Sequence, residues 1–455
     1  MESRTGQRCW RILYVLFVLY VPYSSNDWAH AQEPLPKYVG LNECQTCHGG
    51  GAVQYPNLTN SFQIWVREDE HSKAYDHLRS DLGLHVAEWM GLLLEPGQEA
   101  NWEKCVRCHM VNAPAERRLP AFNPATEGIG CEACHGPAEN YLVPHKSQSY
   151  AENLKVGLAD LKDLRTRARR CLDCHAGLDH EIAAAGHPDL NFEFFHFSFW
   201  QPPHWNYEEA SPLKFWAIGQ VAALERTVEH LIEDSKLYRP IPEFEEKSCY
   251  NCHHKLDQDR WRQTEAHAAA VLPMVKNLLG PDRADRLQAE LEEFRIAAVE
   301  AFPDGSGGSK DLETVGKNLT AGWVDEVSAA LSAKALSPDL LKALLRDLTE
   351  PLPSVDKGGG PHLPLVWMVQ NFNTAEQVYL GIQSLIYAVP GKVGSPNTET
   401  LTGQAFGEGG SAQFKESLEG LYDFLKYRKI EARSEAFETE GFNRGLEAVR
   451  DDIAN

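Results

Sequence analysis

The sequence lacks an excess of basic residues and lacks any long apolar run. Its 44 lysines and arginines are outnumbered by 65 aspartates and glutamates, so the formal net charge is −21. Such a charge argues against nucleic acid or an anionic membrane as the partner, because both repel acidic surfaces. An acidic protein would instead steer a basic protein partner towards itself. With 455 residues, the chain is long enough for two or three domains.

The one N-terminal apolar run is too short to cross a bilayer. Ile12 to Val21 gives ten apolar residues, whereas a spanning helix needs about 18–20. Arginines precede this run, and Ala29-His30-Ala31 follows it as a small-x-small site, an order typical of a secretion signal. We expect residues 1–31 to be removed, which leaves an exported, periplasmic protein that is soluble after signal cleavage. An uncleaved membrane anchor is the alternative.

Beyond this segment no cysteine stands alone. The ten remaining cysteines form five C-x-x-C pairs, and a histidine follows every pair. In this motif two thiols add to the vinyl groups of a haem, and the histidine binds its iron. Zinc sites and redox dithiols also use C-x-x-C pairs, but neither requires a histidine after each pair. We therefore predict five covalently attached haems of type c. The attaching cysteines and proximal histidines are Cys44, Cys47, His48, Cys105, Cys108, His109, Cys131, Cys134, His135, Cys171, Cys174, His175, Cys249, Cys252 and His253.

The motifs divide the mature chain into two regions. All five lie in residues 32–265, and so dense a set of haems can form a core with little regular secondary structure. Aromatic residues cluster between residues 191 and 207. We expect these side chains to pack against haem, with a dedicated substrate pocket as the alternative.

Residues 266–455 contain no motif and show helical periodicity. Three apolar faces illustrate it: Leu287, Leu291 and Phe294; Val378, Tyr379, Ile382, Leu385 and Ile386; and Phe414, Leu418, Leu421, Tyr422 and Leu425. Glycine- and proline-rich breaks are expected at 303–308, 351–364 and 390–410. We predict a mainly α fold, in which an irregular haem-packed multihaem cytochrome domain precedes an all-α helical domain. The helical domain is a candidate docking surface for the haem domain or for another subunit of a redox complex.

Several segments resemble the cytochrome c554 family. Trp65-Val-Arg-Glu-Asp-Glu-His71 is similar to its W-x-x-S-x-H segment, with Asp69 in place of the serine. The run 130–137 followed by His145 resembles the C-E-x-C-H-G-P…H block of the family, and the run 185–193 resembles a G-H-P…F-E block of related multihaem cytochromes. The resemblance spans roughly residues 38–255. A fifth motif and a long helical C-terminus depart from the family.

A second set of histidines is needed for the sixth position of each iron. The mature chain has twelve histidines besides the five proximal ones. The resemblance implies that His71, His145 and His187 are such distal ligands. His204 is added for its aromatic setting, and His254 because it directly follows a proximal histidine, as in several small multihaem cytochromes.

The number of histidines available as distal ligands bears on two possible functions. A haem with two axial histidines is closed and suits electron transfer, whereas one with a single protein ligand is open to substrate. The many spare histidines favour an electron carrier between redox partner proteins, with no catalytic residue assigned. The alternative is a multihaem oxidoreductase that acts on a small nitrogen or sulfur compound at one open haem, with the haem of Cys105 or Cys171 as its candidate. The C-x-x-C-K motif of pentahaem nitrite reductases is absent.

Overall fold

The computed structural model describes most of the chain, in segments. The described residues are 35–50, 60–92, 99, 102–188, 190, 192–202, 204–205, 212–236, 262–300, 309–334, 337–350, 372–387, 398–425 and 439–454. Over these residues the fold is mainly α-helical, which confirms the predicted fold class. The extended structure seen there is one isolated bridge between Tyr38 and Arg118. Among the described helices, none combines the length and apolarity that a membrane crossing requires.

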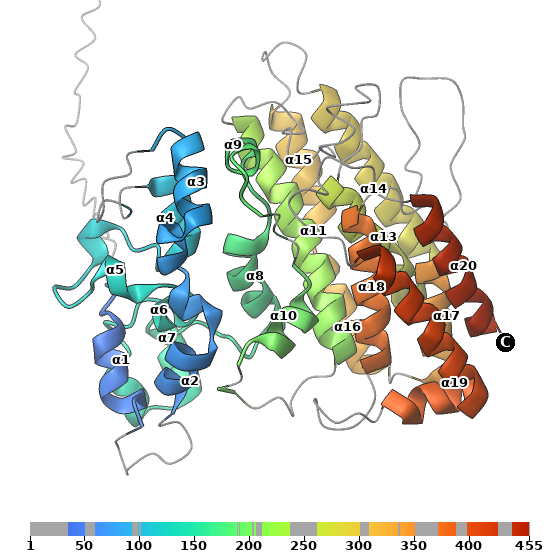
Figure 1. Ribbon diagram of the computed structural model, residues 1–455, viewed down its shortest axis with the longest axis horizontal. Coiled ribbons are helices and arrows are strands. Elements are labelled where there is room, and N and C mark those ends of the chain that lie inside the picture. Colours follow the sequence, from blue (N-terminus) through green and yellow to red (C-terminus); the bar gives the residue numbers. More distant parts are fainter. Residues whose placement is uncertain are drawn as a thin grey trace, which may run out of the picture. The chain divides into compact units, whose positions relative to one another are not determined.

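Up to residue 200 the helices are short and are joined by turns (Figure 1). They are α1 (Leu41–His48), α2 (Ser61–Glu68), η1 (Glu70–Lys73), η2 (Asp76–Arg79), α3 (Asp81–Trp89), α4 (Glu103–His109), η4 (Ala115–Arg117), α5 (Pro124–Glu127), α6 (Cys131–His135), η5 (Pro144–Lys146), α7 (Tyr150–Lys155), α8 (Leu164–His175), α9 (His180–Ala184) and α10 (Phe194–Trp200).

The apolar side chains of this region form several small clusters instead of one core. One cluster surrounds Trp102 and Met110, and others contain Tyr141 and Phe122. Clusters of this size bury little apolar surface, and burial of apolar surface is the main force that stabilises a fold. The region therefore needs another source of stability.

From residue 212 onwards the helices are longer (Figure 1). They are α11 (Pro212–Lys236), α13 (Arg262–Leu279), α14 (Pro281–Glu300), α15 (Ser309–Thr320), α16 (Trp323–Ala333), α17 (Pro338–Thr349), α18 (Phe372–Tyr387), α19 (Thr398–Leu425) and α20 (Thr439–Ala454).

A single apolar core runs through these long helices. Helix α11 packs against α13, α15, α16 and α18, and α13 also packs against α14 and α17. Helix α8, which carries the fourth motif, joins the same core through Leu172 and packs against α11. The core therefore includes residues on both sides of position 265, where the sequence places a domain boundary.

Glycines let two of these helix pairs approach closely. A Cβ atom at Gly381 of α18 would lie 3.1 Å from Nε1 of Trp216 on α11, and one at Gly219 would lie 2.4 Å from the Cβ of Phe194. Only the missing side chain makes room for these aromatic rings. Trp216 itself is fully buried between the helices.

The predicted apolar faces are confirmed with one exception. Leu287, Leu291 and Phe294 of α14 are buried, as are the equivalent leucines of α19. Tyr422, by contrast, is 47% exposed and stacks on Tyr379 at the edge of the core. The break expected at 390–410 was wrong from residue 398 onwards, because α19 begins at Thr398 despite its glycines. Helix α19 packs against α17, α18 and α20.

Replacing Trp216 with alanine should destabilise the helical core strongly. Removal of a large buried ring costs about 3–5 kcal/mol, because it forfeits burial and leaves a cavity. Chemical denaturation followed by far-ultraviolet circular dichroism would measure the loss. The matched control is Trp89→Ala, since Trp89 is 71% exposed and its loss should change stability by about 0.5 kcal/mol or less. Equal effects of the two changes would contradict this packing.

Candidate metal centres

Each described C-x-x-C-H motif ends a helix. Helices α1, α4, α6 and α8 all have the motif histidine as their last residue. Residues at i, i+3 and i+4 share one helical face, so both thiols and the imidazole point to the same side. After α6 the chain turns at Gly136, whose φ of 82° favours glycine. The helix end thus presents two thiols and one imidazole to the same space.

Each of these four motif histidines lies opposite a second histidine. The ring centroids of His48 and His145 are 6.3 Å apart, and those of His71 and His175 are also 6.3 Å apart. The other two pairs are His109 with His187 at 6.1 Å and His135 with His204 at 6.2 Å. These four partners are the histidines that the sequence analysis named as distal ligands. The fifth, His254, lies outside the described residues.

The partner histidines come from short helices and turns. His71 lies in η1 and His145 in η5, while His187 follows α9 and His204 follows α10. Every pair joins two segments that are distant in sequence, so the pairs also tie the small clusters of this region together.

Hydrogen bonds fix the rings from their Nδ1 side. His109 Nδ1 donates to the carbonyl of Ala74 at 2.6 Å, and His145 Nδ1 donates to the carbonyl of Tyr141 at 2.9 Å. His187 Nδ1 likewise donates to the carbonyl of Pro188 at 2.8 Å. A proton on Nδ1 leaves the lone pair of Nε2 available, which is the usual arrangement of a metal-bound histidine.

Burial keeps two of the motif histidines neutral. It lowers the pKa of His135 to about 4, with the neighbouring His204 adding to the effect. It likewise lowers the pKa of His175 to about 4, with a contribution from His71. Only the neutral imidazole can bind a metal, so these rings are ready to coordinate at neutral pH.

The cysteines of different motifs lie side by side. The thiol of Cys44 hydrogen-bonds that of Cys131, and the thiol of Cys108 hydrogen-bonds that of Cys174. All eight described motif cysteines are free and half-buried. The first motif is therefore next to the third, and the second is next to the fourth.

Buried carboxylates, which the sequence analysis did not single out as functional, hold the first and third motifs in place. Glu132, inside the third motif, accepts backbone N–H groups of Val39 at 3.0 Å, Gly40 at 2.9 Å and Ala138 at 2.7 Å. Glu127 accepts the backbone N–H of Leu41 at 3.1 Å, and burial raises its pKa to about 7. Both residues anchor the start of α1. The C-E-x-C-H block was the available sequence signal for Glu132.

The aromatic cluster surrounds the fourth motif histidine. The rings of Phe192 and Phe197 lie 5.4 Å and 5.5 Å from that of His175. Phe194, by contrast, faces the helical core and packs on Phe215. The cluster therefore connects the histidine pairs with the long helices.

Two further buried histidines have ordinary partners. His196 Nδ1 is 2.5 Å from a carboxylate oxygen of Glu193, and His267 Nδ1 is 3.1 Å from the amide oxygen of Gln220. Neither forms a pair with a motif histidine among the described residues. The fifth motif, Cys249, Cys252 and His253, and its neighbour His254 lie outside the described residues.

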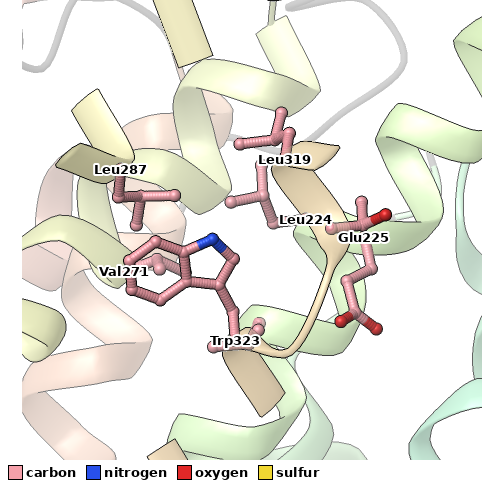
Figure 2. Close-up of a pocket in the computed structure, with 8 residues that line it drawn as sticks. Leu224, Glu225, Val271, Leu287, Leu319 and Trp323 are labelled. Atoms are coloured by element: carbon pink, nitrogen blue, oxygen red, sulfur yellow. The ribbon is translucent and has the colours of Figure 1, made fainter. Parts of the chain in front are cut away.

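A small cavity lies between the long helices (Figure 2). Its volume is about 10 Å³, room for about one water molecule. Apolar side chains such as Leu287 and Trp323 line it, and the carboxylate of Glu225 points away from the Trp323 indole (Figure 2). Glu225 instead pairs with Arg165 at 3.3 Å. A gap this small and apolar is a packing defect and cannot hold a substrate.

Comparison with known proteins supports the chemistry of the motifs. Residues 43–136, which contain the first three motifs, match the family model "Cytochrome c554 and c-prime". Cytochrome c-554 of Nitrosomonas europaea is 25% identical over 147 residues, which is 30% of this chain and 57% of that protein. The chain thus spans somewhat more than half the length of that relative. No solved structure matches the chain.

The matched residues therefore form a c554-type segment of this chain. Such a segment implies haem c attached covalently to its C-x-x-C-H motifs. The family model ends at residue 136, so the second half of the chain lies outside that match.

Replacing Glu132 with alanine should destabilise the motif region. Three backbone N–H groups would lose a buried acceptor, and each such loss costs about 1–3 kcal/mol, or at least about 3 kcal/mol in total. Denaturant titration of the haem absorbance would measure this loss. Glu139→Ala is the control, because Glu139 is exposed and accepts only the Lys37 N–H among the described residues. A stability equal to that of the control would refute the anchoring role.

Proposed function

We propose that this protein is an exported pentahaem c-type cytochrome that relays electrons one at a time between redox partner proteins. The four histidine pairs are the observation that carries this proposal. Haem, when bound, supplies the one-electron couple of its iron. The chain supplies the thiols that attach it and the imidazoles that hold its iron from both sides.

The spacing of the rings fits an iron atom between them. A metal–nitrogen bond is about 2 Å long, and a ring nitrogen lies about 1.1 Å from its centroid, so two imidazoles on one metal have centroids about 6.2 Å apart. The four pairs have 6.1–6.3 Å. We therefore assign His145, His204, His187 and His71 as distal ligands of the haems of His48, His135, His109 and His175.

A closed iron favours the carrier over the enzyme. An iron with two histidines cannot bind substrate without losing one of them, so it can only exchange electrons. The pairs of His109 and His175 oppose the open haem expected at Cys105 or Cys171 under the enzyme alternative. That alternative would have to use the fifth haem. His254 follows the proximal His253 directly and is predicted to bind a neighbouring haem, so it does not close this one.

Contacts between motifs support a continuous relay. The thiol pairs Cys44–Cys131 and Cys108–Cys174 would make the haems of motifs one and three neighbours, and likewise those of motifs two and four. Helix α8, which carries motif four, packs against α6 of motif three and α4 of motif two. Electrons would thus follow the order one, three, four, two.

The acidic character of the chain supports a basic partner. A net charge of −21 attracts positively charged proteins and accelerates their encounter at low salt. The long helices offer a second surface for a subunit of a larger complex.

Ferric protein should give low-spin electron paramagnetic resonance signals, and reduced protein should bind carbon monoxide at no more than one haem. The reason is that paired histidines leave no free position on at least four irons. Two or more high-spin haems that bind the gas, together with turnover of hydroxylamine or nitrite, would instead establish the enzyme alternative.

Replacement of a single histidine tests whether it is a distal ligand. His187→Ala should add one high-spin haem that binds carbon monoxide, without loss of covalent attachment. His85→Ala is the matched control, because His85 is an exposed histidine of α3 whose ring contacts Trp89 and lies opposite no motif histidine among the described residues.

Native protein should carry five haems and lack its first 31 residues. Intact mass after acid–acetone extraction should exceed the mass of the polypeptide by five haems, because each complete motif attaches one. N-terminal sequencing should begin at Gln32 or within a few residues of it. Four haems, or an intact Met1 chain in the membrane fraction, would contradict the respective assignment.

A further inference from the structure

One of the four distal histidines differs from the others in its Nδ1 partner. His145 and His187 donate to backbone carbonyls, and His204 interacts with the backbone at Pro202. His71 Nδ1 instead lies 2.9 Å from the Oδ1 atom of Asp69. A carboxylate is a stronger acceptor than a carbonyl because it carries a full negative charge.

Burial and hydrogen bonds hold the carboxylate of Asp69 beside His71. Its side chain is 4% exposed, and Oδ1 also accepts the backbone N–H of His71 at 3.0 Å. Oδ2 accepts the side-chain amide of Gln201 at 3.2 Å. No lysine or arginine of the described residues lies within 4 Å of its carboxylate oxygens.

The carboxylate is charged at neutral pH. The two carboxylate oxygens of Asp69 accept three N–H hydrogen bonds, which favour the ionised form. A buried negative charge therefore stands directly behind the imidazole of His71.

Such a charge changes how strongly the imidazole binds iron. An acceptor at Nδ1 pulls the N–H proton towards itself, so electron density shifts to Nε2 and the ligand becomes more basic. A more basic ligand stabilises ferric iron over ferrous iron, because the ferric ion carries one more positive charge. The uncompensated carboxylate acts in the same direction through space.

We propose that Asp69 tunes the haem of Cys171 and Cys174 to a lower reduction potential through His71. This inference rests on the proposed function, since it requires His71 to be the distal ligand of that haem. Asp69 is also the N-cap of η1, because its side chain accepts the backbone N–H of His71. The chain thus uses this one position both to start helix η1 and to set a potential.

The test is Asp69→Asn, followed by spectroelectrochemical titration of all haems. The amide oxygen still accepts from Nδ1 but carries no charge, so His71 should stay bound and one haem should shift to higher potential. Replacement of the residue that hydrogen-bonds a metal-bound histidine typically changes the affinity for the metal by about tenfold or more. A tenfold change in ferric over ferrous preference equals about 59 mV for a one-electron couple.

The control is Glu70→Gln. Glu70 is the next residue, is exposed and pairs with Lys73, so the variant removes the same charge without touching Nδ1. Its potentials should stay close to those of the wild type. Asp69→Ser is the second variant in case the asparagine protein folds poorly, and it should shift the same haem upwards.

The outcomes distinguish an effect of Asp69 on the reduction potential from a purely structural role in holding His71. A low-spin spectrum with one raised potential supports the proposal. Unchanged potentials, or shifts equal to those of Glu70→Gln, would overturn it. A new high-spin signal in both Asp69 variants would show that Asp69 only holds His71 in place. If His71→Ala itself leaves every haem low-spin, the ligand assignment has failed, and the proposed tuning through His71 fails with it.

Discussion

The region that carries the motifs depends on imidazole rings that face each other across the width of one metal atom. At centroid distances of 6.1–6.3 Å, the two rings of a pair gain little from contact with each other. Each ring must be held from behind, which explains why the Nδ1 atoms bind carbonyls or a carboxylate. A short helix or turn suffices to present one ring, so this region needs no long helices.

The second half of the chain obeys a different constraint, the burial of apolar helix faces. Long helices around α11 and α13 share one core, and α8 extends this core to the fourth motif. Phe192 and Phe197 touch the ring of His175, whereas Phe194 belongs to the helical core. Apolar packing and the proposed iron ligation thus meet at α8, so a change in the core next to Leu172 should affect the position of His175.

Negative charge is used differently at the surface and in the interior. Acidic residues outnumber basic ones and give the chain a net charge of −21, and such a charge acts at long range. Glu127, Glu132 and Asp69 are buried, and each is placed where backbone or ring N–H groups need an acceptor. Their charge acts locally, on the position of a motif helix or on the basicity of one imidazole.

The sequence alone was sufficient for everything that depends on residues close together in the chain. The C-x-x-C-H motifs are local, because the chemistry of one haem needs residues at i, i+3 and i+4. Helix periodicity is local too, and the buried faces of α14 and α18 followed from it. The exposure of Tyr422 did not follow from helix periodicity, because the position of neighbouring helices determines whether a side chain is covered. The start of α19 at Thr398 did not follow from it either.

Tertiary structure decided which histidine faces which. His71 lies close in sequence to the first motif, yet the structure sets it opposite His175 of the fourth. Likewise His145 follows the third motif but faces His48 of the first. The sequence could nominate these histidines by context. It could not pair them, because the separation of two rings is set by the packing of distant segments, and so are the backbone N–H groups that meet the carboxylate of Glu132.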